Sequence, residues 1–146
     1  SLYGQIGESL PPEAEAETVL CEGAIVSLAL HDEPVEAWQN WVPLIVTRFA
    51  QNGLLNALAA ALLKSLDEGV TDVVARLGYE KWLQAWRDAF SSLNESDKPK
   101  VEVPFRLYEI GLKYIETDDE AILLTLPIEE RRILRSVLEL PPEKAA

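Results

Sequence analysis

Apolar residues recur at intervals of three and four along almost the whole chain, and this spacing is the feature that most restricts its fold. Such spacing places apolar side chains on one face of an α-helix. No run of alternating Val, Ile or Thr is bounded by hairpin turns, and the brief run at residues 100–103 is too short to found a sheet. The sequence therefore predicts an all-α fold, namely an irregular bundle of about six to seven helices, with an α-solenoid as the alternative.

The length of 146 residues and the apolar fraction of 48% are those of one domain with a substantial core. We expect an N-terminal arm over residues 1–10, a single all-α domain over residues 11–142, and a frayed tail over residues 143–146. The chain opens on Ser1 and contains no Met, so we expect a processed product or a fragment of a larger protein.

Proline, glycine and capping residues divide the helical pattern into segments. The first predicted helix runs from the Pro pair at residues 11–12 to residue 30, and because it is apolar on almost every side from residue 19 onward, we expect it to be buried. Pro43 is expected to kink or split the second helix, and Gly78 to interrupt the fourth. We expect residues 94–100 to form a loop before a fifth helix that begins near residue 105, and residues 117–120 to form a capping box.

Acidic residues dominate the surface charge, with a net charge of −12. No Lys or Arg precedes Arg48, whereas eight acidic residues do. Phosphate groups are bound by clustered basic residues, so this distribution disfavours nucleic acid and anionic membranes as partners. It leaves open a basic partner, or simply a solvated acidic face. There is also no stretch of about 20 apolar residues, so we expect no membrane span. Since a single cysteine allows no internal disulfide, we expect a cytoplasmic protein.

Catalytic and metal-binding chemistry has little support in the sequence. Cys21 is the only cysteine and His31 the only histidine, so internal disulfides and multi-ligand zinc sites are excluded. We interpret Cys21 as a small core residue, and His31 with the acidic residues 32–33 as a helix end followed by an N-cap.

The acidic clusters at residues 118–120 and 129–130 lie at predicted helix starts, where carboxylates stabilise the helix without a metal ion. The chain also has no phosphate-binding loop. We therefore predict no metal, no cofactor and no enzymatic activity.

The aromatic and basic side chains are the candidates for binding a partner. Tryptophan is enriched at binding hot spots, although a helical aromatic stripe is first a core feature. We predict that any exposed tryptophan is Trp38 or Trp41, because the irregularity at Pro43 can open a groove beside them. Arg131, Arg132 and Arg135 form the only basic cluster and are the candidates for docking an acidic partner, with a solvated helix face as the alternative reading.

The last third of the chain carries VPFRL at residues 103–107, then Ile110, Tyr114, TDD at residues 117–119 and LLTLPIEERRIL at residues 123–134. These segments resemble C-terminal helical regions of large bacterial signal-transduction NTPases of the STAND type. Since the chain lacks the phosphate loop that such enzymes carry elsewhere, the resemblance implies a non-catalytic helical regulatory or interaction region, with no active-site residue to carry over.

Taken together, these features predict a non-catalytic α-helical module, part of a larger protein, that binds a protein partner. A binding domain that holds an apolar small ligand between its helices is the alternative, and a metal-dependent hydrolase is the third candidate. The sequence leaves the oligomeric state open.

Overall fold

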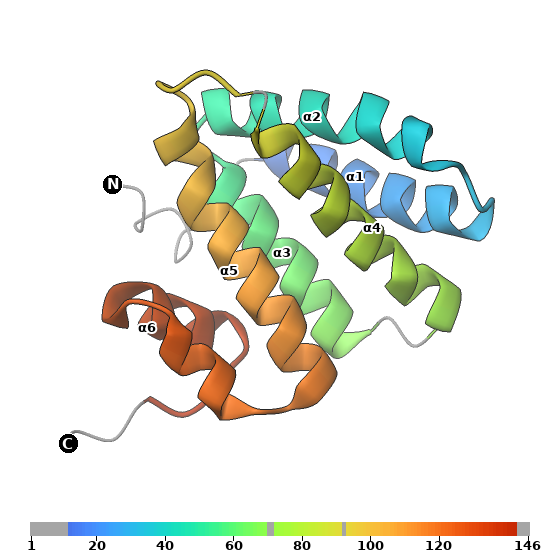
Figure 1. Ribbon diagram of the computed structural model, residues 1–146. Coiled ribbons are helices and arrows are strands. Elements are labelled where there is room, and N and C mark those ends of the chain that lie inside the picture. Colours follow the sequence, from blue (N-terminus) through green and yellow to red (C-terminus); the bar gives the residue numbers. More distant parts are fainter. Residues whose placement is uncertain (1–11, 70–71, 92, 143–146) are drawn as a thin grey trace.

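The computed structural model (Figure 1) describes residues 12–69, 72–91 and 93–142. In these ranges the regular structure consists of six α-helices and one 3-10 helix, without a strand. The elements are α1 (Pro12–Leu30), α2 (Val35–Gln51), α3 (Leu55–Glu68), α4 (Val73–Phe90), α5 (Lys98–Thr117), η1 (Glu120–Thr125) and α6 (Ile128–Val137). The predicted all-α class is confirmed. The predicted arm and tail lie outside the described residues.

Contacts between helices that are distant in sequence hold the fold together. α1 and α2 form an antiparallel hairpin, and α4 packs against both of them (Figure 1). α3 packs along α5, while η1 packs on α5 and α6 packs on both α3 and α5. These contacts form an irregular helical bundle, as predicted.

A row of aromatic rings crosses the core from α2 through α4 to α5. The ring centroids of Trp41 and Trp82 are 5.5 Å apart, and those of Trp82 and Trp86 are 6.0 Å apart, both in edge-on geometry. Trp86 then contacts Phe105 and Tyr108 of α5 at 5.6 and 5.8 Å. The two tryptophans of α4, Trp82 and Trp86, therefore face the core.

Two glycines allow neighbouring helices to approach closely. A Cβ atom at Gly78 would lie 2.9 Å from the carbonyl oxygen of Ile25 and 3.0 Å from Cβ of Ala29, so α1 rests directly on the α4 backbone there. The predicted interruption at Gly78 is wrong, because packing on both sides keeps α4 continuous. At Gly111 of α5, a Cβ atom would meet Cδ1 of Leu63 at 2.6 Å.

The first helix differs from its predicted burial. α1 was expected to be buried all round, but Val19 and Leu20 are 66% and 72% exposed, while Cys21 and Ile25 are buried. Only the side of α1 that faces α4 and α3 is covered, because the hairpin lies at the edge of the bundle. Apolar composition overstated the burial of this helix.

Proline has less effect on helix boundaries than predicted. α2 is one continuous helix through Pro43, so the predicted split is wrong. Trp38 and Val42 before Pro43 and Val46 after it are all buried, so the helix packs along the core on both sides of the proline. α5 begins at Lys98, not near residue 105. The backbone amides of a helix's first turn have no partner within the helix, so Pro99, which has no amide hydrogen, is tolerated there. Residues 98–100 of the predicted loop are therefore helical.

The predicted capping box at residues 117–120 is also wrong. Thr117 is the last residue of α5, and its Oγ1 donates a hydrogen bond back to the carbonyl oxygen of Lys113 at 2.8 Å. Asp118 adopts a left-handed conformation with φ of 56°, and Asp119 caps η1 by accepting a hydrogen bond from the amide of Ala121 at 3.0 Å. The turn thus separates Thr117 from the helix it was expected to cap.

Candidate functional site

An open apolar groove of ≈440 Å³ lies between α1 and α2. It is lined from α1 by Glu17, Leu20, Cys21 and Ala24, and from α2 by Trp41, Ile45, Arg48 and Phe49. The spacings of three and four residues place each set on one helix face. The groove exists because α1 and α2 both pack mainly on α4, which leaves their facing sides partly uncovered.

Exposed leucines flank the groove. Leu20 is 72% exposed in its α1 wall. Leu44 of α2 is 69% exposed, and it lies three residues after Trp41 and four before Arg48, on the same side of the helix. A single exposed leucine is ordinary on a protein surface, but two beside an apolar groove extend it into a larger apolar surface.

The two tryptophans predicted as partner-binding residues have different positions. Trp38 is only 2% exposed, so of the two candidates it is not the exposed one: it lies on the core-facing side of α2 together with Val42 and Phe49. Trp41 is half-buried, lines the groove and stacks edge-on against Trp82. Only Trp41 is therefore within reach of a partner in the groove.

The groove has a charged edge and an inert thiol. Arg48 Nη2 lies 2.6 Å from Glu17 Oε1, and these side chains are 63% and 35% exposed. Cys21 is buried, and burial, with a smaller contribution from the charge of Glu22, raises the pKa of its thiol to about 12. The thiol stays protonated at neutral pH, which agrees with a packing role and not with a nucleophile.

The predicted arginine cluster is engaged within the fold. Arg135 has a side chain that is only 12% exposed; it donates to the carbonyl oxygen of Pro141 and pairs with Glu120, both at 2.8 Å. Arg131 is half-buried, and Arg132 is 66% exposed beside Glu129 at 3.5 Å. Docking of an acidic partner on the three arginines stays a prediction, but only Arg132 presents most of its side chain to solvent.

The acidic cluster at residues 129–130 has a function that the sequence did not reveal. Glu130 was interpreted as a helix-start carboxylate, yet its side chain is 2% exposed and accepts two hydrogen bonds from Arg106 of α5, from Nε at 2.9 Å and from Nη2 at 3.0 Å. This bidentate pair joins α6 to α5. The partners are 24 residues apart, a separation at which spacing gives no signal.

His31 ends α1, as predicted. With its proton on Nδ1, the imidazole donates a hydrogen bond to the carbonyl oxygen of Ser27 at 2.8 Å. Asp32 is not the expected N-cap, because α2 is preceded by Pro34 and has no side-chain cap. His31 therefore lies on the surface as a helix-terminating residue.

Glu116 of α5 and Glu80 of α4 form an acidic pair away from the groove. The hydrogen bond with Glu80, followed by partial burial and the charge of Glu80, raises the pKa of Glu116 from 4.5 to about 7, while the nearby Arg76 acts in the opposite direction. Like-charged carboxylates hold a shared proton in this way.

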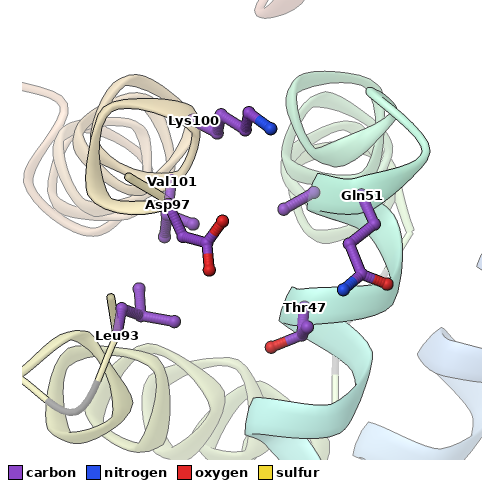
Figure 2. A pocket seen from close by; sticks show the side chains of 7 residues that line it. Thr47, Gln51, Leu93, Asp97, Lys100 and Val101 are labelled. Carbon is purple, nitrogen blue, oxygen red and sulfur yellow. The ribbon is translucent and has the colours of Figure 1, made fainter. Parts of the chain in front are cut away.

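A much smaller pocket lies where the end of α2 meets the start of α5. Figure 2 shows the Asp97 carboxylate pointing into this space, opposite Thr47 and Gln51, with Lys100 at its edge. Its volume of ≈20 Å³ suffices for about one water molecule. The pocket is therefore too small to be a ligand site.

Metal binding and membrane insertion find no support in the described part of the chain. Residues 12–69, 72–91 and 93–142 contain no group of three or more His, Cys, Asp or Glu side chains that could hold a metal ion. None of the helices described there combines the length and apolar character that a membrane crossing requires.

Comparison of the chain with models of known protein families, with curated proteins and with solved structures finds no match in any of the three. Sequence reasoning identified Trp41 but missed Glu17, Leu20, Ile45 and Arg48 as groove residues. Their spacing on each helix was visible, but nothing local to either helix indicated which faces would remain uncovered.

Proposed function

We propose that this domain is a non-catalytic protein-interaction module, working within a larger protein, and that the groove between α1 and α2 binds a helical segment of its partner. The observation that carries the proposal is the open apolar groove with Trp41 in its wall and Leu20 and Leu44 exposed beside it. Two helices that flank a groove present apolar side chains at the spacing that an amphipathic helix matches.

The resemblance of residues 103–134 to helical regions of STAND-type signal-transduction NTPases favours a regulatory setting for this module. In such a setting the domain would recruit or restrain another protein and would not carry out chemistry itself. The inert Cys21 thiol and the surface position of His31 are consistent with that role.

A site for an apolar small ligand is the second candidate. The groove volume lies in the usual range for ligand pockets, roughly 300–1,000 Å³, and Trp41 and Phe49 line it. Such pockets enclose most of their ligand, whereas Leu20 in this wall remains 72% exposed. The openness of the groove therefore favours a long partner over a small molecule.

The proposal is tested with two substitutions at exposed positions, where folding should be unaffected. A Leu20→Asp and Leu44→Asp double variant places charges on the groove, and Leu124→Asp, at a residue 63% exposed on η1, is the matched control. Each form is used to capture partners from native extract, and a recovered partner is purified and titrated into the labelled domain. We expect wild type and control to bind it, with amide shift changes on α1 and α2, and the double variant to lose it.

Equal binding of the same partner by the double variant would contradict the proposed site. Amide shift changes confined to η1 and α6 would also contradict it, because they would move the interface to the opposite side of the bundle. Far-UV circular dichroism of each variant confirms that the helices are retained.

A further inference from the structure

Negative charge is concentrated on the same hairpin that forms the groove. Residues 12–51 carry seven acidic side chains and one basic side chain, Arg48, which is a net charge of −6 out of −12 for the chain. Asp32, Glu33 and Glu36 are all exposed at the turn between α1 and α2, and Glu15 is exposed near the other end of α1. Acidic residues therefore lie beyond both ends of the apolar groove.

The only basic residue of the hairpin already occupies the groove edge. Arg48 reaches from α2 to Glu17 on α1 at 2.6 Å, and both side chains contact solvent. Exposed ion pairs are weak, so a cation from a partner can replace Arg48 beside Glu17. The intramolecular pair thus marks the position at which a basic side chain is favoured.

The length of the groove fits a short helix. Its α1 wall extends from Glu17 to Ala24 and its α2 wall from Trp41 to Phe49, which is about two turns of helix at 1.5 Å per residue. Addition of an extended peptide as a further strand would need a free sheet edge, and the described residues contain no strand. The dimensions and the chemistry both favour a helix with apolar residues on one face.

We infer that the occupant of the groove is a basic amphipathic helix of a partner protein, whose apolar face contacts Trp41, Ile45 and Leu20 and whose Lys or Arg side chains pair with Glu17 and with the carboxylates at the ends of the hairpin. This inference rests on the proposed function and specifies the chemistry of the partner. Charge complementarity of this kind accelerates association and excludes acidic competitors.

The test uses designed peptides as probes. One peptide of about 16 residues, long enough for four turns, has Leu at helical spacing and Lys elsewhere, and a second replaces every Lys by Glu. A scrambled Leu/Lys peptide of the same composition controls for net charge. Binding to the full chain is measured by fluorescence anisotropy of the labelled peptide at low and at physiological ionic strength. We expect the Leu/Lys helix to bind at least about tenfold more tightly than either of the other peptides.

Variants of the groove edge test the position of the charge. Glu17→Gln should weaken binding of the Leu/Lys helix by about two- to fivefold, and Arg48→Gln, which removes the competing cation, should strengthen it by a similar factor. Glu139→Gln and Lys113→Gln make the same charge changes at exposed positions outside the hairpin, after α6 and on α5. These two controls should leave the affinity within about twofold of wild type.

The Leu20→Asp and Leu44→Asp double variant separates groove binding from diffuse attraction. It makes the hairpin more acidic, so a peptide attracted by charge alone would bind it more tightly, whereas a peptide in the groove would lose binding. Undiminished binding to the double variant would overturn both the inference and the proposed site. Equal binding of the Lys and Glu helices, lost in the double variant, would overturn the basic partner and leave the groove as a docking site. Failure of the Leu/Lys helix to bind would overturn the inference.

Discussion

The ion pair between Arg106 and Glu130 predicts an asymmetric effect of mutation. Arg106 is 36% exposed and also contacts Glu102 at 2.8 Å, whereas Glu130 is 2% exposed and has both oxygens bound by Arg106. Removing one member of a buried pair typically costs about 3–5 kcal/mol, because the remaining charge is left buried without a partner.

Substitution of Arg106 should therefore cost more than substitution of Glu130. Arg106→Met leaves the buried Glu130 carboxylate unpaired, and we expect a loss of about 3 kcal/mol, the lower end of the range because the arginine is partly solvated. Glu130→Gln removes the buried charge, while Arg106 still reaches Glu102 and water, so we expect a loss of about 1–2 kcal/mol. An Arg106→Met and Glu130→Leu double variant should be more stable than Arg106→Met alone.

Urea denaturation followed by tryptophan fluorescence and circular dichroism measures these free energies of unfolding, with the m-value as a check that the transition keeps its cooperativity. Hydrogen exchange should also show faster opening of α6 in Arg106→Met, since this pair joins α6 to α5. The reasoning would be refuted if Glu130→Gln were less stable than Arg106→Met. It would also be refuted if the double variant were less stable than both single variants, Arg106→Met and Glu130→Gln.

Two further predictions concern the packing of the helices. Gly78→Ala should lower the free energy of unfolding by about 0.5–2 kcal/mol, because a rigid backbone carbonyl blocks the new Cβ and the overpacking cost exceeds the gain in helix propensity. Urea denaturation measures this change. A variant more stable than wild type would contradict the close approach of α1 to α4. Gly111→Ala should lower the free energy of unfolding by less in the same assay, because the obstructing atoms are the ends of the Leu63 side chain, which borders a void of ≈10 Å³. A larger loss of stability than for Gly78→Ala would show that Leu63 cannot move. The raised pKa of Glu116 predicts that stability falls as pH rises from 4.5 to about 7, since the unfolded chain releases a proton there that the folded protein still binds. Glu116→Gln should flatten this part of the pH profile in thermal unfolding, and an unchanged profile would exclude the pair with Glu80 as its cause.

Local signals in the sequence located the helices well. Spacings of three and four residues and the flanking prolines predicted both ends of α1, and Asp72 caps α4 through the amide of Ala75 at 2.9 Å. These features depend on residues only a few positions apart, so the sequence by itself contains the information. Two predicted breaks, at Pro43 and Gly78, are wrong, because packing from other helices outweighs the local preference for a break.

The tertiary structure alone decided which surfaces stay uncovered. α1 has apolar residues on almost every side, and only its position at the edge of the bundle exposes Leu20 beside the groove while Ile25 is buried. Likewise, Glu130 is buried because Arg106 of another helix pairs with it. The Glu17–Arg48 pair forms only because α1 and α2 lie side by side. Periodicity specifies that a helix has an apolar face, but the partner of that face is set by long-range packing, which has no fixed spacing along the chain.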